Sequence, residues 1–448
     1  MFSVSIWRRR RILGAMRTTP LLLIVGLAIV APACRDDAPV GGEGEGEGEG
    51  EGEGEGEGEG EAPPNSAFFD LLDVLEGTPE AARQAVVDTW LAEHAQTFPF
   101  VDGAVVTFLY VADSGEEDVE LAGDVTAWDF EPQPLDRIAG TTLMHASYQL
   151  PTDARVDYKL IVDGEWILDP RNPSTVPSGF GPNSQAAMPA WDYPEEIDFR
   201  ADILHGAVND VAVGDDVTYP PLSLASTVLG NTRNVWLYTP PGYSNTRDWP
   251  LLVVHDGGEY LHLARMAVVL DNLIRDGAIE PIVVVFVDPV NRGAEYVGNR
   301  VPQMLQFVET ELLPFVDARV RTTSDPTRRG MMGASNGGYL SVRAAVDLSG
   351  LFRRIGSHSG ALCADTSRAT CGSAGVIGSF KDGDVPVDTV IYADTGVIVD
   401  FVEEHEAFTA ALDEGGYRHE GRTWNEGHSW GNWRGHLDEL LVTLFPAP

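Results

Sequence analysis

The chain has 448 residues, of which 43% are hydrophobic and 22% are charged, so it is long enough for at least two folded units with sizeable cores. Its 69 acidic and 30 basic residues give a formal net charge of −39, which repels nucleic acid and anionic membrane surfaces and excludes both as partners of the folded part. Its three cysteines exclude a disulfide-rich scaffold and a zinc site built on cysteine.

Residues 1–33 have the pattern of an export signal. The basic segment Arg8 to Arg11 precedes a ten-residue apolar run, 21–30, which is too short to span a bilayer. Small residues then lead to Cys34, so the segment resembles a bacterial lipoprotein signal, in which Cys34 is lipidated. The alternative is an ordinary signal peptide cleaved near Ala33. Both predict an exported protein, either anchored to the cell envelope through Cys34 as its only membrane contact or secreted.

Residues 34–64 are predicted to be a linker, and residues 65–98 a short helical lead-in. Glutamate alternates with glycine from Glu43 to Glu61, and these like charges repel one another, so we expect an extended, solvated tether. In the lead-in, apolar residues recur at helical spacing, which predicts two short amphipathic helices at 68–75 and 79–94.

Residues 99–195 are predicted to form an all-β sandwich. Segments such as 105–112 and 156–164 alternate apolar and polar residues and are separated by glycine, aspartate and proline. Several short strands at this spacing are typical of a β-sandwich. Trp128 and Trp166 could stack on a sugar or aryl ligand, but we expect them to pack in the core or between domains.

Residues 200–448 alternate strand and helix patterns, which predicts a doubly wound, mostly parallel α/β domain. The segment 282–289 begins with six consecutive apolar residues, which is typical of a buried parallel strand. Helical patterns cover 261–275 and 304–320 among other segments.

The strongest catalytic signal is the sequence Gly333-Ala334-Ser335-Asn336-Gly337. It follows an apolar run and opens a helical pattern, the setting that a G-x-S-x-G nucleophile elbow requires. The glycines relieve crowding at the strained turn. We therefore predict Ser335 as a nucleophile.

A serine nucleophile needs a base and an oxyanion hole. Of the histidines that follow Ser335, His428 lies in a loop just before the last helical pattern, where a hydrolase histidine belongs. An early strand breaks at Gly257 and Gly258, and the amide of Gly258 or Gly257 is expected to pair with that of Asn336 around the oxyanion.

These motifs resemble the putative-esterase family, which includes enterochelin esterases, esterase D and several carbohydrate esterases. The resemblance rests on the Ser335 elbow and on the segments 238–243, 255–260, 292–299, 311–314 and 427–434. Residues 99–195 resemble the early-set immunoglobulin-like domain that precedes the catalytic domain in enterochelin esterases, on Gly123-Asp124, Tyr158-Lys159, 169–173 and Asn183-Ser184.

The resemblance implies an α/β-hydrolase fold and hydrolysis of a siderophore trilactone or its iron complex, with no metal or organic cofactor in the enzyme. It also places Arg292 and Glu295 together near the rim of the substrate pocket, where the alternative role is a purely structural ion pair that anchors the loop. A carbohydrate esterase that removes feruloyl or acetyl groups is the alternative enzyme. From another class, the chain could be a surface-displayed binding protein on an inactive hydrolase fold.

The triad acid departs from the family pattern. In the relatives the acid follows a strand-ending glycine closely, whereas here Gly396 is followed by three apolar residues before Asp400. We favour Asp400, displaced by one position, because a carboxylate that reaches the distal ring nitrogen still orients the imidazole. The alternatives are Asp394, or a serine–histidine dyad without an acid.

Cys363 and Cys371 are predicted to form a disulfide. They are the only cysteines left once Cys34 is lipidated or removed, and an exported protein meets an oxidising compartment. They lie eight positions apart in a polar loop, so the bridge would fix the shape of that loop near the active-site face.

Overall fold

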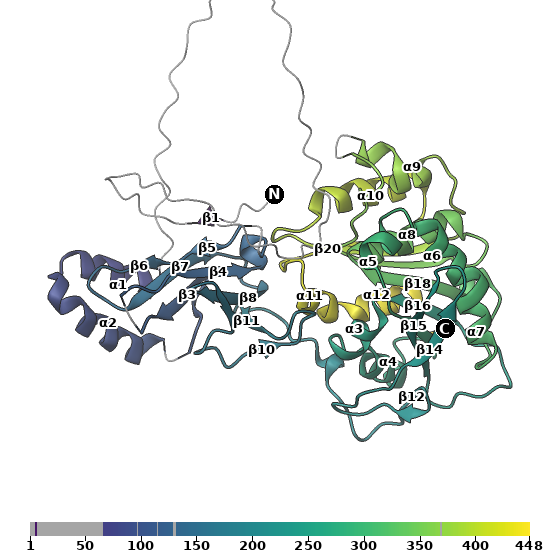
Figure 1. Cartoon of the computed structure of the whole chain (residues 1–448), viewed down its shortest axis with the longest axis horizontal. Helices are drawn as coiled ribbons and strands as arrows, with labels where there is room; N and C mark the ends of the chain where they lie inside the picture. Colours follow the sequence, from purple (N-terminus) through teal and green to yellow (C-terminus); the bar gives the residue numbers. More distant parts are fainter. Residues whose placement is uncertain (1–4, 7–65, 96, 114, 129–130, 368–369) are drawn as a thin grey trace, which may run out of the picture.

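The computed structural model describes residues 5–6, 66–95, 97–113, 115–128, 131–367 and 370–448. The expected lipidation site Cys34 and the Gly-Glu linker lie outside the described residues, as does the signal segment apart from β1 (Ser5–Ile6), which pairs with β7. The described residues form two lead-in helices, a β-sandwich and an α/β domain (Figure 1). None of the helices in this part of the chain is long and apolar enough to cross a bilayer.

The lead-in forms the two expected helices, α1 (Ala67–Glu76) and α2 (Glu80–His94). Helix α1 begins after Ser66, whose hydroxyl accepts a hydrogen bond from the amide of Phe68 and so caps the helix. Phe68 packs with Leu109 and Leu143 of the sandwich, so the lead-in covers the outer face of one sheet.

The sandwich consists of two antiparallel sheets. One follows the order β1-β7-β3-β2, with β6 beside β7, and the other β10-β11-β8-β4-β5, with β9 beside β8. Their bounds are β2 (Phe100–Asp102), β3 (Val105–Val111), β4 (Val119–Gly123), β5 (Gln133–Pro134), β6 (Asp136–Arg137), β7 (Leu143–Gln149), β8 (Arg155–Val162), β9 (Glu165–Ile167), β10 (Thr175–Val176) and β11 (Asn183–Ala187).

Side chains from both sheets meet in one core. Phe108 of the first sheet packs edge-on against Tyr158 of the second, with ring centroids 4.7 Å apart. The expectation that Trp166 packs is wrong, because its side chain lies on the short edge strand β9 and is 45% exposed. Trp128 is partly buried, and its Nε1 donates a hydrogen bond to Asp124.

The α/β domain contains a ten-stranded sheet in the order β13-β12-β15-β17-β16-β18-β19-β20-β21, with β14 beside β15. The strands β17, β16, β18, β19, β20 and β21, in this spatial order, run parallel, and β15 lies antiparallel to β17. Their bounds are β12 (Ala207–Val208), β13 (Val211–Ala212), β14 (Leu222–Ser226), β15 (Asn231–Thr239), β16 (Leu251–His255), β17 (Val283–Val287), β18 (Arg329–Ala334), β19 (Arg354–His358), β20 (Val390–Gly396) and β21 (Arg418–Trp424).

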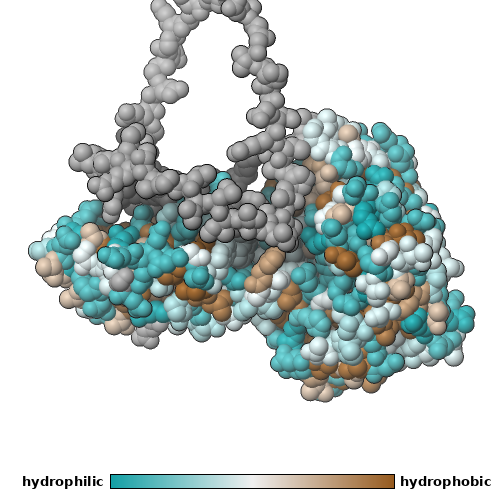
Figure 2. All heavy atoms as spheres, viewed as in Figure 1, coloured by the Kyte–Doolittle hydropathy of each residue, from teal (hydrophilic) through white to brown (hydrophobic). Residues whose placement is uncertain are grey.

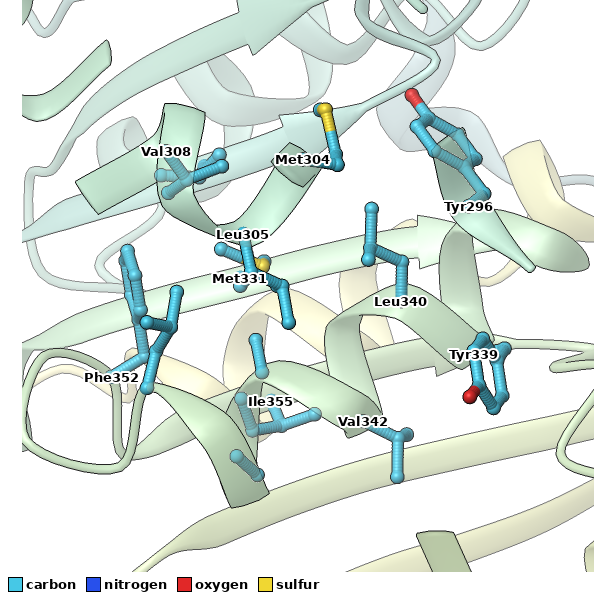
Figure 3. Close-up of a cluster of buried hydrophobic side chains, with 14 of the residues drawn as sticks. Tyr296, Met304, Leu305, Val308, Met331, Tyr339, Leu340, Val342, Phe352 and Ile355 are labelled. Carbon is cyan, nitrogen blue, oxygen red and sulfur yellow. The ribbon is translucent and has the colours of Figure 1, made fainter. Parts of the chain in front are cut away.

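Helices cover both faces of this sheet. They are α3 (Gly257–His262), α4 (Met266–Arg275), α5 (Arg292–Tyr296), α6 (Val301–Phe307), α7 (Leu313–Asp317), α8 (Asn336–Asp347), α9 (Gly375–Lys381), α10 (Val402–Gly415), α11 (Trp430–Gly435) and α12 (Leu437–Leu444). On β16, Val253 packs with the core under α6 and α8, and Val254 with the core under α4 and α12. Figure 3 shows the first core, where Met304, Met331 and Leu340 converge.

Two of the expected helices are interrupted. The helix expected at 261–275 is broken at Arg265, whose φ of 52° lies in the left-handed region, so α3 and α4 are separate. The helix expected at 304–320 passes through one π-helical turn, Val308–Leu312, between α6 and α7. On the face shown in Figure 2, apolar residues form only small, separate areas on a largely hydrophilic surface.

Candidate active site

Ser335 stands on a sharp turn between a buried strand and a helix. Strand β18 is buried throughout, and α8 begins at Asn336, directly after the serine. Ser335 has φ of 55° and ψ of −119°, a conformation that a non-glycine residue adopts only at a cost. A Cβ at Gly333 would lie 2.6 Å from the carbonyl carbon of Gly337, so the turn closes only with glycine there. This is the geometry of a nucleophile elbow.

His428 and Asp400 meet at the same edge of the sheet. Nδ1 of His428 lies 2.8 Å from Oδ1 of Asp400, and since an ionised carboxylate only accepts hydrogen bonds, Nδ1 carries the proton. The imidazole packs edge-on against the rings of Phe401 and Trp433, with centroids 5.1 and 5.0 Å away. The His428 side chain is 29% exposed, and that of Asp400 is fully buried. The second ring nitrogen of His428 can therefore face a substrate.

The Asp400 carboxylate is held in its ionised form. Burial by itself raises the pKa of Asp400, but the pKa lies below its usual value because His428, Ser359 and the Gly396 amide stabilise the charge more. The Ser359 hydroxyl donates to Oδ2 at 2.6 Å, and the Gly396 amide donates to the same oxygen at 2.8 Å. An acid fixed in this way orients the imidazole of His428 and stabilises the imidazolium that forms during a reaction.

Ser335 lies beside this pair but is not bonded to it. Its amide donates to the carbonyl of His358 at 2.8 Å, and the next residue, Ser359, binds Asp400. Among the residues that the structure describes, no hydrogen bond joins the Ser335 hydroxyl to His428. Catalytic hydrogen bonds are often long without substrate and tighten when substrate binds, so the missing bond between Ser335 and His428 is compatible with a triad.

Asp394, the alternative acid, belongs to a different pair. Its Oδ2 lies 2.8 Å from Nδ1 of His358 and accepts hydrogen bonds from Tyr392 at 3.0 Å and Trp424 at 3.2 Å. The side chains of His358 and Asp394 are 0% and 1% exposed. The structure therefore brings Asp400, and not Asp394, to His428.

The predicted oxyanion amides differ in their partners. The amides of Gly257 and Asn336 open helices α3 and α8, and within the described part of the chain no hydrogen bond uses either. The amide of Gly258 instead donates to Oδ1 of Asp288 at 2.8 Å. The structure therefore does not support Gly258 as an oxyanion donor, because its amide already donates to the carboxylate of Asp288. Gly257 and Asn336 remain as the candidate pair.

Arg292 and Glu295 do not sit together as expected. Arg292 binds both carboxylate oxygens of Asp256 at 2.9 Å and donates to the carbonyl of Ala334 at 3.0 Å, so it joins the oxyanion loop to the elbow. Glu295 is fully buried and pairs with Arg233 at 3.2 Å. The expectation that Glu295 contacts substrate is wrong, because its side chain is enclosed in the core, whereas Arg292 is 35% exposed.

Cys363 and Cys371 form a disulfide in the structure, with Cα atoms 5.1 Å apart. The amide of Cys363 donates to Glu404 at the start of α10, which ties the bridged loop to the helix after Asp400. In the part of the chain that the structure describes, no group of three or more histidine, cysteine, aspartate or glutamate side chains could hold a metal ion.

Comparison with known proteins agrees with this fold. The family model described as "Putative esterase" matches residues 226–382. The iron(III) enterobactin esterase of Dickeya dadantii (strain 3937) is 26% identical over 387 residues, which cover 74% of this chain and 85% of that protein. Over residues 226–382 the chain is therefore similar to the putative esterase family, and over most of its length it is similar to an enterobactin esterase. It is a carboxylic ester hydrolase.

Two further relatives extend the comparison. The esterase is 26% identical to the uncharacterized protein YbbA of Bacillus subtilis (strain 168) over 198 residues. This alignment covers 41% of this chain and 76% of YbbA. The crystal structure of ferric enterobactin esterase from Salmonella typhimurium superposes with a TM-score of 0.62 at 23% identity, covering 76% of this chain and 93% of that one. This second likeness supports the α/β-hydrolase fold of the esterase.

Proposed function

We propose that the chain is an exported serine esterase that hydrolyses carboxylic esters through Ser335, His428 and Asp400. The observation that carries the proposal is the 2.8 Å contact between His428 and the buried, ionised Asp400, at the sheet edge where the Ser335 elbow ends β18. In this proposal the sandwich is of the early-set immunoglobulin-like type, and Cys34 is the lipid anchor.

In the reaction, Ser335 Oγ forms a bond to the ester carbonyl carbon while Nε2 of His428 takes the hydroxyl proton. The amides of Gly257 and Asn336 stabilise the oxyanion. When the carbon–oxygen bond of the leaving group breaks, His428 returns the proton to the departing alcohol. Water then attacks the acyl-enzyme with His428 again as base, which releases the acid and restores Ser335.

The proposed substrate is an enterochelin-type siderophore trilactone or its iron complex. Support comes from the iron(III) enterobactin esterase relative, which this chain matches over 85% of that protein's length and therefore across both folded regions. A catalytic domain alone would match only part of such a relative.

The experiment is to incubate the purified protein with enterobactin, its iron(III) complex and methyl ferulate, and to follow the products by chromatography. We expect ester cleavage of enterobactin, labelling of the protein by a fluorophosphonate probe, and loss of both in Ser335→Ala by several orders of magnitude. Ser244→Ala is the matched control, because the Ser244 hydroxyl makes only an exposed hydrogen bond, to the hydroxyl of Thr246, among the described residues. Faster cleavage of methyl ferulate would favour a carbohydrate esterase, and no labelling of the wild type would indicate an inactive binding protein.

A further inference from the structure

The sandwich domain contacts both loops that carry the His428–Asp400 pair. Helix α11, which begins two residues after His428, lies between the sandwich and the large sheet in Figure 1. The contacts are polar on the histidine loop, residues 425–431, and apolar on the acid loop, residues 397–400.

Asp124 of the sandwich packs against the residues on each side of His428. Its Oδ2 accepts hydrogen bonds from the hydroxyl of Ser429 at 3.1 Å and from the amide of Asp157 at 2.8 Å. A Cβ added at Gly427 would lie 2.4 Å from Cβ of Asp124. Gly427 therefore lacks a side chain because Asp124 fills that space.

Arg155, the first residue of β8, holds the same loop from a second side. Its amide donates to the carbonyl of Asn425 at 3.1 Å, and its buried guanidinium donates to Glu426 at 3.3 Å. A Cβ at Gly431 would lie 1.9 Å from Nη1 of Arg155. The two glycines around His428, Gly427 and Gly431, thus each make room for one side chain of the sandwich.

The acid loop is inserted into the sandwich itself. Ile398 is 2% exposed and belongs to the hydrophobic core of the sandwich, although it lies in the α/β domain. Its amide donates to the carbonyl of Glu426 at 3.0 Å, which links the acid loop to the histidine loop. Ile398 is one of the three apolar residues between Gly396 and Asp400, the segment whose spacing differs from the family pattern.

We propose that the sandwich is part of the catalytic apparatus, and that Asp124, Arg155 and Ile398 are positioning residues that set the His428–Asp400 geometry. The inference rests on the proposed esterase function of that pair. Its physical basis is that a catalytic pair works only when it is held within about 0.5 Å of its productive geometry by packed and hydrogen-bonded neighbours. The longer acid loop is then an anchor: Ile398 is buried in the sandwich core, Val397 packs partly buried against the same core, and together they fix the position of Asp400.

The test compares two large-to-small substitutions in one core. Ile398→Ala removes the anchor of the acid loop, and Leu121→Ala removes a fully buried side chain of β4 that lies on neither catalytic loop. We expect both to lower Tm. Only Ile398→Ala should lower kcat for a p-nitrophenyl ester, by about 10- to 100-fold with KM unchanged, because a displacement of about 1 Å at a catalytic group has an effect of this size. Ile398→Val should restore most of kcat.

A milder variant covers the case in which Ile398→Ala does not fold. Ser429→Ala deletes a single hydroxyl that bonds Asp124, and we expect it to lower kcat by about 3- to 10-fold at unchanged KM, the effect of one hydrogen bond. If the wild type is active and these variants keep its kcat, or if Leu121→Ala loses kcat equally, the positioning role is overturned and the esterase function stands. A wild type without esterase activity overturns the proposed function, and the positioning role with it.

Discussion

Two histidine–aspartate pairs lie next to each other at the carboxyl edge of the sheet, and they differ in access to solvent. In His428–Asp400 and in His358–Asp394, Nδ1 stands 2.8 Å from a carboxylate oxygen. Ser359 joins them, because it follows His358 in the chain and its hydroxyl binds Asp400. The His428 side chain is 29% exposed, whereas that of His358 is fully buried.

If His428 is the base, as proposed, this difference means that pairing with a carboxylate does not by itself make a histidine a catalytic base. Nε2 of His358 is buried without a hydrogen-bond partner among the described residues, and the His358 ring stacks with that of Tyr260 at a centroid distance of 6.4 Å. The backbone carbonyl of His358 instead accepts a hydrogen bond from the amide of Ser335, so the buried pair supports the strand next to the nucleophile elbow. A base must reach the proton that it removes, and only His428 has access to do so.

The largest expected effect separates the two histidines. His428→Ala should lower kcat by about 10⁴- to 10⁶-fold with little change in stability, because the serine loses its base. His358→Ala should lower the free energy of unfolding by about 1–3 kcal/mol, since Asp394 loses a buried hydrogen bond, and should leave kcat within about tenfold. Steady-state kinetics and thermal denaturation of both variants check this. The reverse pattern would assign catalysis to the buried pair.

The next effect separates the two acids. Asp400→Asn should lower kcat by about 10³- to 10⁴-fold, because an amide no longer holds the reactive tautomer of His428. Asp394→Asn should lower Tm and leave most of kcat, since the Asp394 carboxylate bonds His358, Tyr392 and Trp424 rather than His428. Kinetics at one saturating ester concentration, with unfolding curves for each variant, measure both. Equal activity of Asp400→Asn and the wild type would favour a serine–histidine dyad.

The smallest effect is on the pH dependence of stability. Burial raises the pKa of both Asp394 and Asp400, but the histidine partners and hydrogen bonds outweigh burial, so each pKa lies below the usual 3.8. Such groups stabilise the fold above the pKa of the unfolded chain, and this stability is lost as the pH falls through the folded pKa. The free energy of unfolding should therefore fall more steeply below about pH 4 in the wild type and in Ser244→Ala than in Asp394→Asn. Denaturant titrations between pH 3 and pH 6 compare the slopes, and identical slopes would contradict the ionised state of Asp394.

Much of the fold could be predicted from the sequence because its patterns are local. The apolar run of β17, the alternating strands of the sandwich and the G-x-S-x-G turn each depend on residues that are adjacent in the chain. The break at Arg265 has no signal in the sequence, because apolar residues continue on both sides of it through 261–275. Ser359 was missed as a partner of Asp400 because a single serine after a strand has no distinctive signal.

The elements, the elbow and the candidate base follow from local sequence, because backbone preference and hydrophobic periodicity act over a few residues. The folded chain was needed to find which aspartate bonds His428, that Gly258 binds Asp288, and that Glu295 lies in the core with Arg233. These outcomes depend on contacts between residues far apart in the chain. The placement of Ile398 in the sandwich core is the clearest case, because the short apolar segment before Asp400 gains its role only when a second domain packs over it.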